Sequence, residues 1–142
     1  MKIAIANDHG GTQLKHAIVQ HLSAKGIDVI NLGTDADASV DYPDYAKKVT
    51  DALLAQEADL GILCCGTGIG MSIAANKVAG IRAAVVSDTF SAQATREHNH
   101  SNILCLGQRV VGEGLALLLV DTWLAATPQA GRHLGRVAKL EA

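Results

Sequence analysis

The alternation of short apolar runs with helical patterns restricts the fold of this 142-residue chain more than any other feature. Several of the runs are apolar at consecutive positions, as in strands that are covered on both faces. They are residues 2–6, 28–32, 60–65, 82–87 and 103–106. Such alternation is typical of βαβ units around a parallel sheet. It predicts an α/β fold with five parallel strands, in one domain that spans residues 1–142.

Helical spacing fills the segments between the first three runs. One apolar stripe consists of Leu14, Ala17, Ile18 and Leu22. A second consists of Ala46, Val49, Ala52 and Leu53, and it begins just after Pro43, a residue that suits a first helical turn. Both stripes predict helices with one face on the sheet.

Two later segments have less regular helical patterns. Residues 115–125, LALLLVDTWLA, are apolar on more than one face, which indicates either burial on both sides or contact with another subunit. We favour a dimer contact. The tail, residues 131–142, would place Arg132 and Arg136 on one helical face, although Gly135 between them disfavours a helix.

The charge and the cysteines limit the classes of function. The chain has 12 basic and 14 acidic residues, so no general field attracts nucleic acid or an anionic membrane. No segment approaches the roughly 20 apolar residues that span a bilayer, and the N-terminus lacks the apolar core of a signal peptide. Three cysteines are an odd number, and adjacent ones rarely pair, so we expect free thiols and a cytoplasmic protein.

Polar segments follow four of the predicted strands. They are NDHGG (7–11), CGTGIG (65–70), SDT (87–89) and GQR (107–109). In an open α/β sheet, ligands bind beyond the carboxyl ends of the strands, where the strand order reverses. We therefore predict that the order begins 2-1-3, so that the segments after the first and third strands, NDHGG (7–11) and CGTGIG (65–70), flank one crevice.

The glycine-rich segment after the third strand carries a thiol. Gly66, Gly68 and Gly70 permit backbone turns in which N–H groups converge on an anion, although a tight turn alone explains them equally well. Their spacing matches neither a P-loop nor a dinucleotide fingerprint. The N-terminus of the following helix would favour the thiolate form of Cys65, which could then serve as a base or a nucleophile. Cys64, on the other side of the strand, and Cys105 are predicted to be core residues.

Histidines, an aspartate and arginines complete the set of candidate residues. Asp8 and His9 end the first strand, and His98 and Asn99 precede the fifth. A metal site would need a fuller ligand set, so we expect neither metal nor cofactor, and acid–base work suits His98 better. Arg132 and Arg136, with Arg109, could hold a phosphate, although paired arginines on a terminal helix are often only a solvated face.

Together these groups indicate proton transfer next to a carbonyl. An aldose–ketose isomerase without metal needs a base that moves a proton between C2 and C1, donors for the enediolate oxygens and an acid that opens the sugar ring. It also needs a grip on a remote phosphate that orients the reacting end.

Six motifs in this order resemble the ribose-5-phosphate isomerase B family, the RpiB/LacAB group that also contains allose-6-phosphate and galactose-6-phosphate isomerases. They cover nearly the whole chain: NDHGG (7–11), VDYPDYA (40–46), CGTGIGMSIAANKVAGIRAA (65–84), REHNHSN (96–102), LGQRVVG (106–112) and GRHLGRV (131–137). The resemblance implies a Rossmann-like three-layer α/β/α sandwich with a C-terminal helix. It also implies a metal-independent homodimer whose sites are completed by the partner subunit, with a tetramer left open.

The resemblance also implies a role for each matching residue. Cys65 resembles the proton-shuttling base, because Met71 stands where other members carry a glutamate, and His98 resembles the residue that opens the furanose ring. Sugar-hydroxyl and enediolate contacts are implied for Asp8, Tyr42, Thr67 and Asn99, with the amides of Gly66, Gly68 and Gly70 around the oxyanion. A phosphate clamp is implied for His9, Arg109, Arg132 and Arg136, the last two from the partner subunit.

We therefore predict interconversion of D-ribose 5-phosphate and D-ribulose 5-phosphate through an enediolate, a reaction of the pentose phosphate pathway. The nearest alternative substrate is a six-carbon sugar phosphate, allose 6-phosphate or galactose 6-phosphate. A non-catalytic phosphate- or nucleotide-binding domain would need the glycines and arginines, but neither Cys65 nor His98. A redox role ranks below both, because Cys64 and Cys65 do not form a C-x-x-C pair.

Overall fold

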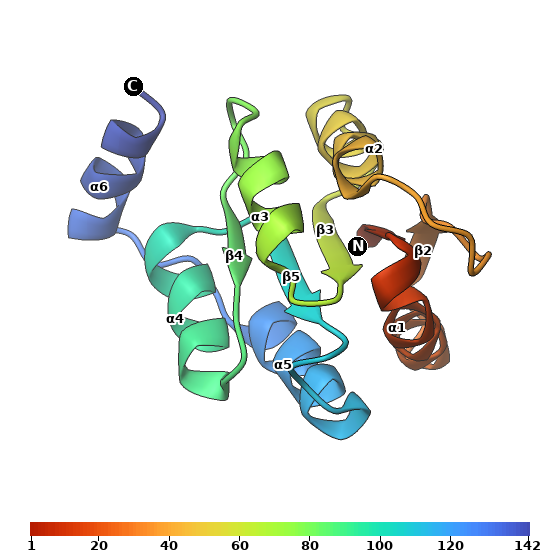
Figure 1. The fold of residues 1–142 in the computed structure, drawn as a ribbon. Helices are drawn as coiled ribbons and strands as arrows, with labels where there is room; N and C mark the ends of the chain where they lie inside the picture. The colour runs from red at the N-terminus through yellow and green to blue at the C-terminus, as the bar shows by residue number, and fades with distance from the viewer.

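One parallel sheet of five strands organises the fold in the computed structural model, which describes residues 1–142 (Figure 1). The strands are β1 (Lys2–Asn7), β2 (Asp28–Asn31), β3 (Leu60–Cys65), β4 (Ala83–Val85) and β5 (Ile103–Gly107). Their order is β2-β1-β3-β5-β4, and every neighbouring pair is parallel. The predicted 2-1-3 start of the order is confirmed.

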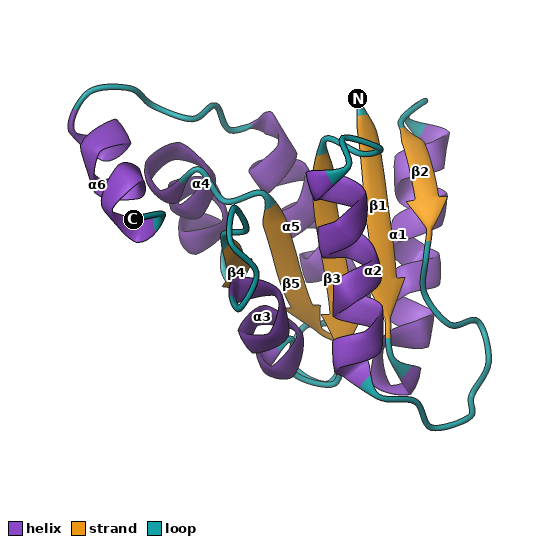
Figure 2. Cartoon of the chain, turned by 90° about the horizontal axis from the view of Figure 1, so that it is seen from above, coloured by secondary structure: helices purple, strands orange, loops and turns teal.

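Helices cover both faces of the sheet and give three layers. They are the short 3-10 turn η1 (His9–Gly11), α1 (Thr12–Ala24), α2 (Tyr42–Leu54), α3 (Ile69–Asn76), α4 (Thr89–Asn99), α5 (Glu113–Ala125) and α6 (Arg132–Leu140). α1 and α5 pack on one face, α2 and α3 on the other, and α6 lies outside α4 (Figures 1 and 2). The predicted α/β/α sandwich and C-terminal helix are confirmed.

Two apolar clusters fill the spaces between these layers. The α1/α5 side buries Ile3, Ile5, Ile62 and Leu104 with Trp123, and the α2/α3 side buries Ala4, Ala6 and Leu63 with Met71. Successive residues of a strand face opposite sides. Cys64 therefore belongs to the first cluster, and Cys65 to the second.

Element boundaries differ from the predicted ones where a helix begins. β4 covers Ala83–Val85 instead of the predicted 82–87. Three residues later, the Asp88 carboxylate accepts a hydrogen bond from Ser91 N at 2.7 Å and starts α4. α2 begins at Tyr42, so Pro43 lies inside its first turn rather than before it. Proline is favoured there because the first helical N–H groups have no partner within the helix.

α5 buries one side only. Ala116, Leu119, Val120 and Trp123 are buried, whereas Leu115 and Leu118 are exposed at 39% and 53%. The subunit contact of this segment stays a prediction. No helix of the chain is both long and apolar enough to cross a bilayer.

Gly11 marks a close backbone approach, and replacing it with alanine is expected to destabilise the fold. An added Cβ would lie 2.6 Å from the carbonyl carbon of Cys64, whose main chain cannot move without disturbing β3. We expect a loss of about 1–3 kcal/mol in the free energy of unfolding, measured by urea denaturation. As a control, Gly114→Ala meets no atom within 4 Å and should be neutral or slightly stabilising. Equal stabilities for the two variants would contradict the close approach.

Candidate active site

The turn after β1 lies against the turn after β3. The backbone N–H of Asp8 donates to Cys64 O at 3.2 Å, and a Cβ on Gly10 would lie 3.0 Å from Gly66 N. β1 leads into α1 on one face of the sheet, and β3 leads into α3 on the other. The strand order therefore reverses between β1 and β3, which is where α/β sheets bind their ligands.

Cys65 is the last residue of β3 and lies at the beginning of α3. Its Sγ accepts a hydrogen bond from the N–H of Gly68 at 3.0 Å. Gly68 has φ of 79°, a left-handed conformation that glycine adopts without strain, and it is the residue before α3. The sulfur of Cys65 thus lies at the N-terminus of α3, with a backbone N–H group directed at it.

The other two thiols lie in a different environment. Burial raises the pKa of Cys64 and of Cys105 far above the ordinary thiol value, and neither side chain is exposed to solvent. Both stay protonated and behave as small apolar groups. The prediction that these two cysteines are core residues is confirmed.

Close packing shapes the glycine loop around Cys65. A Cβ on Gly70 would lie 2.7 Å from Cε1 of Tyr42, so the ring of Tyr42 lies directly on this glycine. The hydroxyl of Thr67 accepts a hydrogen bond from Ile69 N at 3.2 Å. The N–H groups of Gly66 and Thr67, in contrast, have no acceptor within the chain.

The turn after β5 supports the same loop. Gln108 N donates to Cys65 O at 2.9 Å, and Arg109 N donates to Gly66 O at 3.0 Å. The side chain of Arg109 is exposed, and its Nε would be 3.9 Å from a Cβ on Gly66. A cationic group thus stands at the edge of the loop.

His9 is exposed beside Asp8, and one of its ring nitrogens is already used. Nδ1 accepts a hydrogen bond from Val40 N at 3.1 Å, so a neutral His9 carries its proton on Nε2. One oxygen of the Asp8 carboxylate accepts from Gly10 N at 2.8 Å, which fixes the orientation of that side chain. The structure thus brings together Asp8, His9, Tyr42, Cys65, Gly66, Thr67, Gly68, Gly70 and Arg109.

His98 and Asn99 do not join this group within one chain. They end α4, and the next segment runs to Asn102, whose carbonyl accepts from Gly61 N at 2.9 Å. Gly61 lies four residues before Cys65 on β3, a separation of about 13 Å along the strand. His98 and Asn99 therefore lie at the amino ends of the strands.

A second cluster forms there between α4 and α6. The rings of His98 and His133 stack with centroids 4.4 Å apart and planes 9° apart. Partial burial lowers the pKa of His133, and the neighbouring His98, Arg132 and Arg136 lower it further. The predicted residues Arg132 and Arg136 thus accompany His98 rather than Cys65.

Polar contacts missed in the sequence hold this second cluster. Arg82 donates to the carbonyl of Asn99 at 3.1 Å and to the Glu141 carboxylate at 2.6 Å, which lowers the pKa of Glu141. His100 Nε2 lies 2.7 Å from Gln129 O in the segment before α6. His100 therefore links the end of α4 to that segment.

The Cys65 end of the sheet does not form an enclosed pocket in one chain. None of the four surface hollows is lined by Cys65. The hollow beside the second cluster, about 500 Å³, is lined by Arg82, Asn99 and Glu141 among others. No group of three or more potential metal-ligating side chains occurs in the chain.

Known proteins resemble this chain over almost its whole length. A family model described as Ribose/Galactose Isomerase matches residues 3–140. Ribose-5-phosphate isomerase B of Escherichia coli is 52% identical, over 99% of this chain and 95% of that protein. The structures of ribose-5-phosphate isomerase B from Clostridium thermocellum and Thermotoga maritima are 55% and 51% identical and give TM-scores of 0.98 and 0.97. Each covers 99% of this chain, and the matches span 95% and 97% of those chains.

Proposed function

Because the chain belongs to the ribose/galactose isomerase family, we propose that it interconverts D-ribose 5-phosphate and D-ribulose 5-phosphate with Cys65 as the base. It is an aldose–ketose isomerase of the ribose-5-phosphate isomerase B type. The role of Cys65 is supported by the position of its Sγ, which accepts a hydrogen bond from Gly68 N–H at the carboxyl end of β3.

Proton transfer through an enediolate accounts for the chemistry. The Cys65 thiolate takes the proton from C2 of the open-chain aldose, and the electron pair moves to the carbonyl oxygen at C1. The thiol then returns a proton to C1, and the proton of the C2 hydroxyl passes to the oxygen at C1, so that C2 becomes the ketone and C1 carries a hydroxyl. The free N–H groups of Gly66 and Thr67 can donate to the oxygens that carry negative charge in between.

The remaining residues bind and prepare the sugar phosphate. His98 opens the furanose ring, and Asp8, Tyr42, Thr67 and Asn99 contact hydroxyl groups. His9, Arg109, Arg132 and Arg136 hold the phosphate, whose binding energy orients the reacting carbons. Each role remains a proposal for the residue named.

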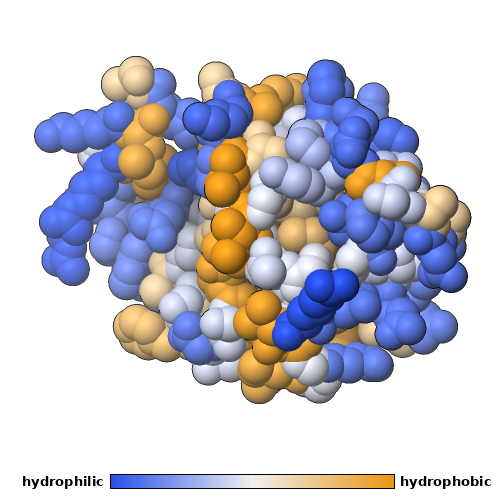
Figure 3. Space-filling model, in the orientation of Figure 1, coloured by the Kyte–Doolittle hydropathy of each residue, from blue (hydrophilic) through white to orange (hydrophobic).

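A second copy of the chain would complete the site. Cys65 and His98 lie at opposite ends of the same sheet, so one chain cannot apply both to one sugar. An apolar face lies close to Cys65: Ile69, Ile73, Val85, Phe90 and Val110 are exposed by 42–79%. In Figure 3 hydrophobic surface runs down the face on which Figure 1 places α3 and β4. Monomers rarely expose such a patch, so we propose a homodimer with shared sites.

Replacing Arg132 or Arg136 with alanine is expected to weaken the binding of phosphorylated substrates but not that of free sugars. A charge-assisted contact to phosphate contributes about 1.5–3 kcal/mol, so kcat/KM for ribose 5-phosphate should fall about 10- to 100-fold. The rate with free ribose should not change. Lys139→Ala, on the same helix, is the matched control and should leave both rates unchanged. An equal loss with phosphorylated and free sugar would refute the clamp.

Steady-state kinetics with several sugar phosphates would test the substrate. We expect ribose 5-phosphate to be converted with a higher kcat/KM than allose 6-phosphate or galactose 6-phosphate, the alternatives that the relatives do not favour. A higher value for either six-carbon substrate would overturn the assignment. The single domain over residues 1–142 and the cytoplasmic location stay predictions, as does any assembly beyond a dimer.

A further inference from the structure

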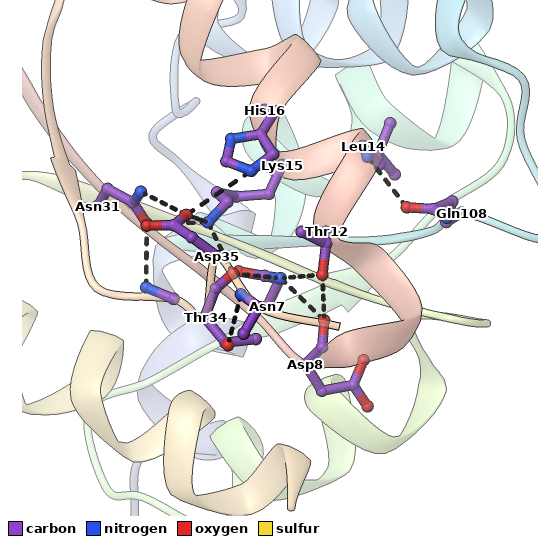
Figure 4. A network of polar contacts seen from close by, with 12 residues as sticks. Asn7, Asp8, Thr12, Leu14, Lys15, His16, Asn31, Thr34, Asp35 and Gln108 are labelled. Carbon is purple, nitrogen blue, oxygen red and sulfur yellow. Dashed lines mark hydrogen bonds and ion pairs between the residues drawn. The ribbon is translucent and has the colours of Figure 1, made fainter. Parts of the chain in front are cut away.

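A lysine with a completely buried side chain lies behind the Cys65 end of the sheet. Lys15 is on α1, and its side chain has no exposed area. Nζ donates to Thr34 O at 2.9 Å and to Asn31 Oδ1 at 3.3 Å, and it forms an ion pair with the carboxylate of Asp35 (Figure 4). A buried ammonium group is costly unless all its protons find acceptors, and here three acceptors surround it.

Asn7 connects this network to Asp8. Its Nδ2 donates to Thr34 O at 3.1 Å, to Asp8 O at 2.8 Å and to Thr12 Oγ1 at 3.2 Å. The carbonyl of Thr34 therefore accepts from both Lys15 and Asn7. The turn that carries Asp8 and His9 is thereby connected to the segment after β2.

That segment, residues 32–41, is attached near its two ends. The first attachment is the contact of Thr34 and Asp35 with Lys15, and the second is Val40 N–H on His9 Nδ1. Residues 36–39 between the attachments are exposed. The segment leads directly into Tyr42, whose ring lies on Gly70.

The electrostatics agree with a strong first attachment. The hydrogen bond from Lys15 lowers the pKa of Asp35, and that from Asn31 lowers it further. Asp35 itself is 63% exposed, so it could turn into solvent if Lys15 did not hold it. Lys15 is buried and the Asp35 side chain is exposed, so this contact fastens an exposed segment to the interior of the protein.

We propose that Lys15 is a positioning residue of the isomerase site, which holds residues 32–41 so that His9 and Tyr42 face the substrate. The proposal rests on the proposed function, because it assigns those two residues to substrate binding. Lys15 touches no substrate itself. It holds the segment through Thr34 and Asp35, and the segment in turn positions His9 and Tyr42, which bind the sugar phosphate.

The test is Lys15→Met, which keeps an unbranched side chain one atom shorter and removes the hydrogen-bond donors. We expect faster amide hydrogen exchange in residues 33–41 and a KM for ribose 5-phosphate raised about ten-fold, with kcat within about three-fold, because Cys65 is not displaced. Lys47→Met is the matched control: Lys47 is exposed and pairs only with Asp51 four residues on, and it should change neither quantity. Should Lys15→Met fail to fold, Asp35→Ala removes the exposed partner and should show the same changes to a smaller degree.

A double-mutant cycle separates positioning from mere stability. If Lys15 acts through His9, Lys15→Met should raise KM much less in a His9→Ala background than in the wild type, whereas independent effects would multiply. Unchanged exchange in residues 33–41, an unchanged KM, or multiplying effects would each overturn the proposal. A wild-type chain that does not convert ribose 5-phosphate would refute the proposed function instead. The exchange experiment would then decide alone whether Lys15 holds the segment.

Discussion

Cys65→Ala is expected to lower kcat for ribose 5-phosphate by about 10³-fold and to leave substrate affinity nearly unchanged. A positioned general base contributes typically 10²–10⁴-fold, and no other titratable side chain shares the hydrogen bond of Gly68 N–H. The glycine loop and the phosphate-binding residues are not altered by the substitution, so they should still bind the sugar. Steady-state kinetics and calorimetric titration with ribose 5-phosphate measure the two quantities.

Cys64→Ala provides the matched control for this result. Cys64 is the preceding residue, has the same side chain and belongs to the opposite core cluster. Its removal should cost some stability, because it leaves a small cavity, and should leave kcat within about two-fold. Undiminished turnover by Cys65→Ala would remove Cys65 from the mechanism, and a comparable loss in Cys64→Ala would attribute the effect to packing.

Mixing Cys65→Ala chains with His98→Ala chains is expected to restore activity that neither variant has alone. If Cys65 and His98 of one site come from different subunits, a mixed dimer holds one site with both defects and one site with none. Random exchange of equal amounts makes about half the dimers mixed, so about a quarter of the wild-type activity should return. The assay follows ribulose 5-phosphate formation after subunits have been dissociated and reassociated.

The control mixture contains Cys65→Ala and the double variant Cys65→Ala/His98→Ala. It forms the same mixed dimers but no intact site, so its activity should stay at the level of the single variants. Mass spectrometry of differently labelled chains verifies that mixing has occurred. No recovery in the first mixture, despite verified mixing, would place Cys65 and His98 in one subunit's site and would contradict the shared arrangement.

The sequence predicted the beginning of the strand order, and with it the meeting of the turns that carry Asp8 and Cys65. Consecutive apolar residues in 60–65 and the stripe from Leu14 to Leu22 reflect burial that depends on local periodicity, and such periodicity is visible in one chain. Once β1 and β3 are neighbours, the turns that carry Asp8 and Cys65 must meet. These features follow from rules of parallel sheets rather than from particular contacts.

The place of His98 could also have been predicted. A residue just before a parallel strand lies at its amino end, and Cys65 lies at a carboxyl end, so the spacing of His98 before β5 already separates the two. The role of Lys15 could not be predicted. Its partners Thr34 and Asp35 are 19 and 20 residues away, in an irregular segment whose path no periodicity describes. The stacking of His98 on His133 likewise depends on how α6 returns to α4.

The different burial of the three thiols determines which cysteine reacts first with an oxidant or an electrophile. Cys64 and Cys105 have no exposed surface, whereas Cys65 keeps 6% at the mouth of the glycine loop. An electrophile or peroxide from solvent therefore meets only one of the three thiols, because close packing shields Cys64 and Cys105 and keeps them protonated. Oxidation would modify the Sγ of Cys65, the proposed base, before it modified the core cysteines. The protein would then lose its activity while it remained folded.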